Sequence, residues 1–141
     1  MLLLSSLAFA AAPPPIVSGE TTSDYPEVVA LYMTDSTGRQ GGLCTGSLIA
    51  PNWILTASHC VSDTRSFVIE DIYVMFVNST NDADQSNTKL AASWIANPDY
   101  NDRTGLNDIA LVELRSDRDG PFMPLVDMGP RPKDLDTNFR I

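Results

Sequence analysis

The sequence predicts an all-β protein, built as a small antiparallel barrel or sandwich. Short segments rich in Val, Ile, Leu, Tyr and Phe recur along the chain, and clusters of Gly, Asp, Asn and Ser separate them. No long stretch repeats its apolar residues with a helical period. The length of 141 residues suits one domain with a modest core of its own.

The predicted strands follow one another with turns between them. The first predicted strand, Val28–Met33, is followed by DSTGRQGG, whose glycines and polar residues predict a turn or hairpin loop. The polar run from Asn78 to Thr88 predicts a surface loop. The predicted strands, about six in number, are Val28–Met33, Leu43–Ile49, Trp53–Thr56, Phe67–Val77, Lys89–Ala96 and Ile109–Leu114.

The N-terminal residues have the features of a secretory signal peptide. Their apolar stretch is too short to span a bilayer, which takes about 20 residues, and Ala8 and Ala10 form an A-x-A cleavage signal. The prolines at 13–15 argue against the alternative, a buried N-terminal helix. No Lys or Arg precedes the apolar stretch, so either the α-amino group supplies the charge or the true start lies upstream. We interpret residues 1–12 as a signal peptide, cleaved near Ala10, of a secreted, extracellular protein.

The charge balance argues against two classes of partner. Asp and Glu number 18 against 9 Lys and Arg, and the formal net charge is −9. A nucleic-acid-binding protein would show a clustered basic surface, and a protein held at an anionic membrane would carry a polybasic segment. We therefore expect no nucleic-acid partner, and no membrane association once the signal peptide is removed.

The sequence contains two cysteines, Cys44 and Cys60. In an oxidising compartment they make sense as a disulfide pair, and closing a loop of about 15 residues is worth roughly 3 kcal/mol by chain-entropy arguments. The alternative is two free buried thiols in a cytosolic protein. Two thiols cannot form a four-cysteine zinc site, and we expect neither a metal nor a cofactor.

His59 is the only histidine in the chain. A single histidine in a β-rich domain is more often structural than catalytic, but its neighbours favour a catalytic role. His59 directly precedes Cys60 and follows the predicted strand Trp53–Thr56, while Asp108 directly precedes another apolar strand. A carboxylate is costly to bury there without a partner. An imidazole is such a partner, because the carboxylate accepts the Nδ1 proton and stabilises the imidazolium that forms when Nε2 takes a proton from a serine.

Two motifs carry a resemblance to a known family. GSLIAPNWILTASHC and NDIALVEL resemble the histidine and aspartate motifs of the trypsin-like (chymotrypsin-fold, S1 family) serine proteases. The segment IVSGETTSDYPEVVAL is similar to the mature N-terminus of that family. The resemblance covers Ile16 to about Val126, with the motifs in the family's order. Each motif alone is weak, but together they are highly specific.

The resemblance implies a domain organisation. Residues 16–119 would form a six-stranded antiparallel Greek-key barrel, the N-terminal barrel of a two-barrel protease. Residues 13–15 would be a short propeptide. Residues 120–141, which include several prolines and glycines, would be a linker and the start of the second barrel. That second barrel, which the active site needs, is absent from the sequence.

The resemblance also implies roles for single residues. His59 would be the general base and Asp108 the carboxylate that orients it, with the Cys44–Cys60 disulfide bracing the histidine loop. Ile16 would be the new N-terminus after removal of the propeptide. Pro15 precedes Ile16, so an activating protease that cuts after Lys or Arg would not make this cut.

Two further residues depart from the family pattern. Ser18 replaces the first glycine of the N-terminal motif, which is expected to be tolerated. Ser58 stands where the family usually has alanine, and we expect little consequence for the base.

A nucleophilic serine is missing from the sequence, because no Gly-Asp-Ser-Gly-Gly motif occurs in it. Our first hypothesis is a secreted serine endopeptidase acting on protein or peptide substrates, present here as a fragment that is inactive alone. The alternative is a catalytically inactive homologue that serves as an extracellular binding module, and a third hypothesis is a truncated gene model.

Five serines could be considered as substitutes for the missing nucleophile, but none lies in a Gly-x-Ser-x-Gly context: Ser47, Ser58, Ser62, Ser66 and Ser93.

Overall fold

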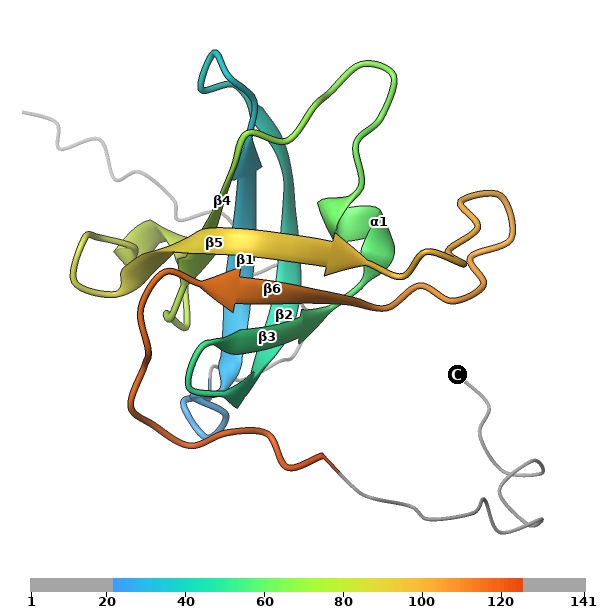
Figure 1. Cartoon of the computed structure of the whole chain (residues 1–141). Coiled ribbons are helices and arrows are strands. Elements are labelled where there is room, and N and C mark those ends of the chain that lie inside the picture. Colours follow the sequence, from blue (N-terminus) through green and yellow to red (C-terminus); the bar gives the residue numbers. More distant parts are fainter. Residues whose placement is uncertain (1–21, 126–141) are drawn as a thin grey trace, which may run out of the picture.

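A computed structural model describes residues 22–125, which form one β-barrel (Figure 1). The predicted signal peptide at 1–12, the propeptide at 13–15, Ile16 and residues 126–141 of the predicted linker lie outside the described residues. The strands are β1 (Val28–Thr34), β2 (Gln40–Ala50), β3 (Trp53–Thr56), β4 (Asp71–Met75), β5 (Thr88–Ala96) and β6 (Ala110–Leu114).

The six strands close into an antiparallel barrel in the order β1-β2-β3-β6-β5-β4. Every pair of neighbours is antiparallel, and the closing pair joins β1 to β4. Within this circle the order β4-β1-β2-β3 is that of a Greek key. The predicted all-β, six-stranded antiparallel barrel is confirmed.

The interior of the barrel is filled by apolar side chains that alternate along the strands. In β1, Val29, Leu31 and Met33 point inward and are buried, while Val28 is exposed. This alternation is the period of two that a strand with one buried face requires. Each fully buried aliphatic side chain contributes about 1.5–3 kcal/mol. The largest fully buried side chains are Leu31, Leu48, Ile54, Ile72, Val29, Val74 and Val112.

The fourth strand is shorter than predicted, because it begins at Asp71 and not at Phe67. Of the residues before it, Phe67 and Ile69 bond through their backbone to a neighbouring turn, while the N–H of Glu70 donates to the carbonyl of Thr34 at the end of β1 over 2.8 Å. Phe67 forms an isolated bridge with Thr64, and the backbone N–H of Ile69 donates to Asp63 Oδ1 over 2.8 Å. The second strand is longer than predicted, because the glycine-rich end of the turn still pairs with β1.

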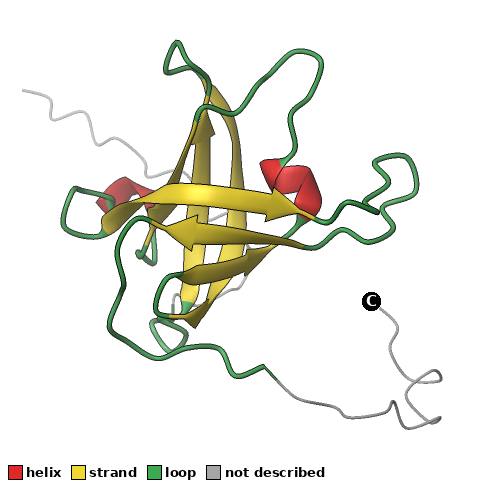
Figure 2. Cartoon of the chain, in the orientation of Figure 1, coloured by secondary structure: helices red, strands yellow, loops and turns green. Residues whose placement is uncertain are grey.

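Two short helices interrupt the connections between strands (Figure 2). The α-helix α1 (Ser58–Val61) directly follows β3 and packs against β5 and β2. In Figure 1 it lies beside the end of β5, where the orange loop to β6 begins. The 3₁₀-helix η1 (Thr80–Asp82) lies in the polar segment that was predicted to be a surface loop, and its residues are exposed. Within residues 22–125, none of the helices has the length and apolar character needed to cross a membrane.

Candidate active site

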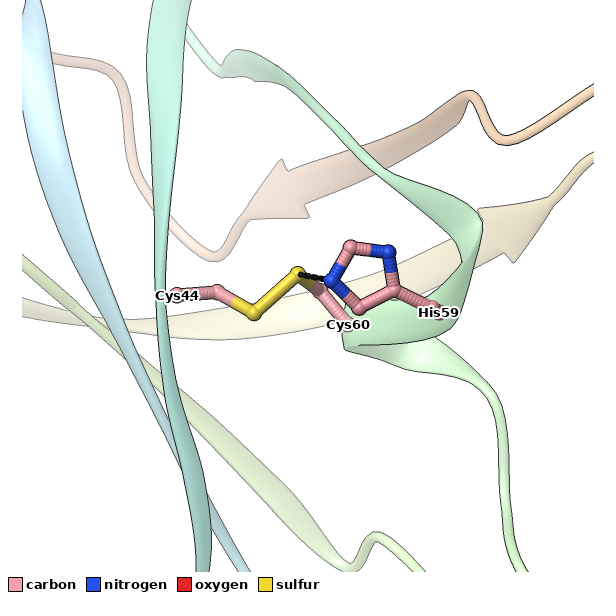
Figure 3. A group of neighbouring side chains, drawn as sticks. All are labelled: Cys44, His59 and Cys60. Carbon is pink, nitrogen blue, oxygen red and sulfur yellow. Dashed lines mark hydrogen bonds between the residues drawn. A yellow bond between two sulfur atoms is a disulfide. The ribbon is translucent and has the colours of Figure 1, made fainter. Parts of the chain in front are cut away.

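His59 lies on α1, which a disulfide holds against the barrel. Cys60, the next residue, is bonded to Cys44 in β2, with 6.1 Å between the two Cα atoms. Figure 3 shows the imidazole beside this disulfide. The predicted Cys44–Cys60 pairing is confirmed. Both sulfurs are bonded to each other, so neither is a thiolate that could bind a metal together with His59, although the three side chains are neighbours.

Asp108 lies at the end of the loop that joins β5 to β6. The two ends of this loop are held together, because the N–H of Asn97 donates to the carbonyl of Ile109 over 3.1 Å. Asn107 has a φ of 58°, in the left-handed region that asparagine tolerates better than most residues. Its side-chain Nδ2 donates to the carbonyl of Asp99 over 3.0 Å. The chain therefore turns sharply just before Asp108.

The structure brings His59 and Asp108 into direct contact. The imidazole Nδ1 lies 2.7 Å from Asp108 Oδ2, and the backbone N–H of His59 donates to Asp108 Oδ1 over 2.9 Å. Both carboxylate oxygens thus accept from one residue. An ionised carboxylate only accepts hydrogen bonds, so the neutral imidazole carries its proton on Nδ1 and leaves the lone pair on Nε2.

The carboxyl group of Asp108 is held in its ionised form. The side-chain hydrogen bond from His59 lowers its pKa most, the backbone hydrogen bond from His59 lowers it further, and partial burial opposes both. Hydrogen bonds to the charged form favour that form. At neutral pH the contact is therefore between a carboxylate and an imidazole N–H.

The other imidazole nitrogen, Nε2, is not held by a hydrogen-bond donor in the described part of the chain. Its neighbour is Cys60 Sγ at 3.4 Å (Figure 3), and a disulfide sulfur carries no hydrogen to donate. The side chain of His59 is 58% exposed, whereas that of Asp108 is 28% exposed. The imidazole is thus anchored at Nδ1 and accessible from solvent.

A hollow of about 420 Å³ opens beside the imidazole and is bordered by Ser62, Arg65, Tyr100 and Asp102 among others. Burial, and then the negative charges of Asp108 and Asp102, raise the pKa of Tyr100. The phenol therefore stays neutral at neutral pH and can act as a hydrogen-bond donor beside the exposed imidazole.

Ser58 occupies a place in the site that the sequence did not reveal. Its side chain is fully buried, and its Oγ donates to the carbonyl of Ile109 over 2.7 Å and accepts from the N–H of Asn97 over 3.0 Å. The only signal in the sequence is a small polar residue directly before the histidine. That pattern does not show whether the hydroxyl points to solvent or into the protein.

None of the five serines considered and rejected as substitutes for the nucleophile is hydrogen-bonded to His59 Nε2 within residues 22–125. The hydroxyl of Ser93 donates to Glu113, and that of Ser62 donates to the carbonyl of Ser58. The described residues therefore bring His59 and Asp108 together, but they bring no serine hydroxyl to the imidazole.

A closed six-stranded barrel with a histidine–aspartate pair at one end has the architecture of one barrel of a trypsin-like protease. The sequence model of the Trypsin family matches residues 16–137. The chain belongs to the Trypsin family.

Curated relatives and solved structures support this assignment. The chain is 38% identical over 81 residues to the urokinase-type plasminogen activator of Gallus gallus, covering 52% of this chain and 18% of that protein. It is 32% identical over 98 residues to coagulation factor XII of Sus scrofa, covering 68% of this chain and 15% of that protein. The solved structure of HL collagenase is similar over 65% of this chain and 37% of its own, with a TM-score of 0.54 and 29% identity. The chain thus spans only a small part of its curated relatives.

Proposed function

We propose that this chain is the N-terminal barrel of a secreted serine endopeptidase and that it supplies two of the three residues of a catalytic triad. His59 is the general base, and Asp108 orients it and stabilises its protonated form. The observation that carries the proposal is the double contact between them, because it fixes the ring while leaving Nε2 free.

In the proposed reaction, a serine hydroxyl attacks the carbonyl carbon of a peptide bond in a protein substrate. Nε2 of His59 takes the hydroxyl proton as the carbon–oxygen bond forms, and Asp108 stabilises the resulting imidazolium. The imidazolium then gives this proton to the leaving amine, which yields an acyl-enzyme. Water, activated by the same base, attacks the acyl carbonyl and releases the second product together with the free serine.

The nucleophile of this reaction is proposed to come from outside the 141 residues, because the sequence contains no Gly-Asp-Ser-Gly-Gly motif. We expect a second barrel to supply the serine, the oxyanion-binding amides and the pocket that selects the substrate. The 141-residue chain by itself is then inactive.

The sequence and the disulfide support secretion. Residues 1–12 have the features of a signal peptide, and a disulfide persists mainly in oxidising compartments. In the same proposal, residues 13–15 are a propeptide and Ile16 becomes the N-terminus of the active enzyme. Pro15 then requires an activating protease that does not depend on Lys or Arg before the cut.

The proposal is tested by assaying the full-length protein from which these residues come, processed so that it begins at Ile16, against peptide and ester substrates. The processed protein should hydrolyse them, and His59→Ala should lower kcat by about 10⁶-fold, because a triad histidine acts as a unit with the serine nucleophile. Ser62→Ala is a matched control on the same surface and should retain activity. Hydrolysis that is indifferent to His59→Ala would contradict the proposed role of His59. No hydrolysis by the processed wild-type protein would contradict the proposal and favour an inactive homologue.

A further inference from the structure

The hydroxyl of Ser58 is the buried polar group closest in sequence to the candidate base. Ser58 immediately precedes His59 and is 0% exposed. A buried hydroxyl is costly unless it is hydrogen-bonded. Its position is therefore stable only if the surrounding backbone provides partners.

Those partners are the two ends of the loop that carries Asp108. Oγ of Ser58 donates to the carbonyl of Ile109 over 2.7 Å and accepts the N–H of Asn97 over 3.0 Å. Asn97 follows β5 and Ile109 precedes β6, so one hydroxyl bonds to both strand ends. These hydrogen bonds lie next to the His59–Asp108 contact in both segments. In α1, Ser58 directly precedes His59, and in the loop, Ile109 directly follows Asp108.

The hydrogen bonds between α1 and this loop come from two residues in the described part of the chain. His59 contributes the bonds to Asp108, and the Ser58 side chain contributes the bonds to Asn97 and Ile109. The backbone of Ser58 also hydrogen-bonds to the carboxyl of Asp108 and helps to lower its pKa. The Cys44–Cys60 disulfide holds α1 to β2 and leaves the loop untouched.

The helix itself provides little further restraint. α1 has four residues, and its N-cap residue, Ala57, makes no side-chain cap hydrogen bond. A helix this short is not stable by its own backbone bonds. Its orientation relative to the loop therefore depends on the side chains that link the two.

We propose that Ser58 is a positioning residue: its buried hydroxyl ties α1 to the Asp108 loop and so keeps His59 and Asp108 in register. The inference rests on the proposed function, in which this pair is the base and its orienting carboxylate. Ser58 touches neither substrate nor the transferred proton. It acts through His59 and Asp108 only.

The test uses the 141-residue chain, whose single histidine gives an unambiguous NMR signal. The wild-type chain should show a slowly exchanging Nδ1–H proton at low field. In Ser58→Ala this proton should exchange roughly tenfold faster, as expected for the loss of the two buried hydrogen bonds that the hydroxyl makes. The fraction of the Nε2–H tautomer should rise in the same variant.

The matched control is Ser62→Ala. It also removes one hydroxyl and one 2.7 Å hydrogen bond at the same helix, but that bond goes to the carbonyl of Ser58 and not to the loop. It should leave the Nδ1–H exchange rate as in the wild type. An unchanged rate in Ser58→Ala, or an equal acceleration in both variants, would overturn the proposal.

If Ser58→Ala fails to fold, backbone hydrogen exchange in the wild-type chain tests the proposal instead. This measurement gives an equilibrium constant for local opening at each backbone N–H. The constants for Asn97 and His59 should agree within roughly threefold, because the Ser58 hydroxyl couples the segments that carry them. Opening constants that differ by about a hundredfold or more would overturn the proposal. The exchange rate, the tautomer and the opening constants can all be measured without a nucleophilic serine. Failure of the positioning proposal would therefore appear in these measurements, whereas failure of the proposed function would appear as no hydrolysis by the full-length protein.

Discussion

Asp108 accepts two hydrogen bonds from His59, one from the backbone N–H over 2.9 Å and one from Nδ1 over 2.7 Å. The backbone bond fixes where the carboxylate lies relative to α1, and the Nδ1 bond fixes the direction of the ring. One carboxylate thus sets both the position and the tautomer of the candidate base.

The tautomer of His59 should depend on Asp108. In the wild-type chain at a pH where the imidazole is neutral, nitrogen NMR should show the proton on Nδ1, because an ionised carboxylate accepts from it. Asp108→Ala should allow the Nε2–H form to become the major one. Asp102→Ala, which removes a nearby carboxylate with no hydrogen bond to His59, should keep the Nδ1–H form. A majority Nε2–H form in the wild type would contradict this prediction.

The stability contributed by Asp108 should be lost in acid. Its pKa is lower in the folded chain, mainly through the hydrogen bonds from His59. A carboxyl group with a lowered folded pKa stabilises the fold above its unfolded pKa of about 3.9, and this contribution disappears as the pH falls through the folded value. Urea unfolding of wild type and Asp108→Asn should therefore differ most above about pH 5 and converge as the pH falls through the lowered folded pKa of Asp108. A difference that grows in acid would have the wrong sign.

The disulfide should make a large contribution to the stability of the barrel. It closes a loop with a sequence separation of 16, for which about 3 kcal/mol is expected. The double variant Cys44→Ala/Cys60→Ala should lower the free energy of unfolding by about 2–5 kcal/mol, measured by urea denaturation. A change below about 0.5 kcal/mol, the scale of an ordinary surface substitution, would show that the disulfide does not brace the fold.

Gly46 in β2 should resist substitution, because a Cβ there would lie 2.6 Å from Ile54 Cγ2 and 3.0 Å from the carbonyl oxygen of Leu55. We expect Gly46→Ala to destabilise the chain by about 1–3 kcal/mol through overpacking. Gly42→Ala in the same strand is the control, since its Cβ would meet only the flexible end of Met33 at 3.3 Å. Equal thermal unfolding midpoints for the two variants would contradict the packing around Gly46.

The strands of the barrel could be predicted because β-branched and aromatic residues cluster where strands form. Trp53–Thr56 matches the prediction at both ends. The residues Phe67–Ile69 could not be placed from composition, since their apolar character does not reveal that the backbone of Phe67 and Ile69 bonds to Thr64 and Asp63. Helix α1 was not predicted, because four residues are too few to show a helical period.

The pairing of His59 with Asp108 joins residues 49 positions apart, and no local pattern specifies such a contact. The sequence suggested it through the cost of leaving the Asp108 carboxylate unpaired and through the resemblance of the two motifs to those of a family. The role of Ser58 could not be predicted at all, because its burial depends on the meeting of three segments that lie far apart in the sequence.

The most direct test of the central proposal is to treat the full-length protein, processed so that it begins at Ile16, with a serine-reactive phosphonate and to locate the modified residue by mass spectrometry. We predict a single modified serine outside the 141 residues, with labelling lost or strongly slowed in His59→Ala. The 141-residue chain alone should remain unlabelled. An unreactive wild-type protein, or a modified serine within these residues, would contradict the proposal that this barrel supplies the base and carboxylate to a serine on a second barrel.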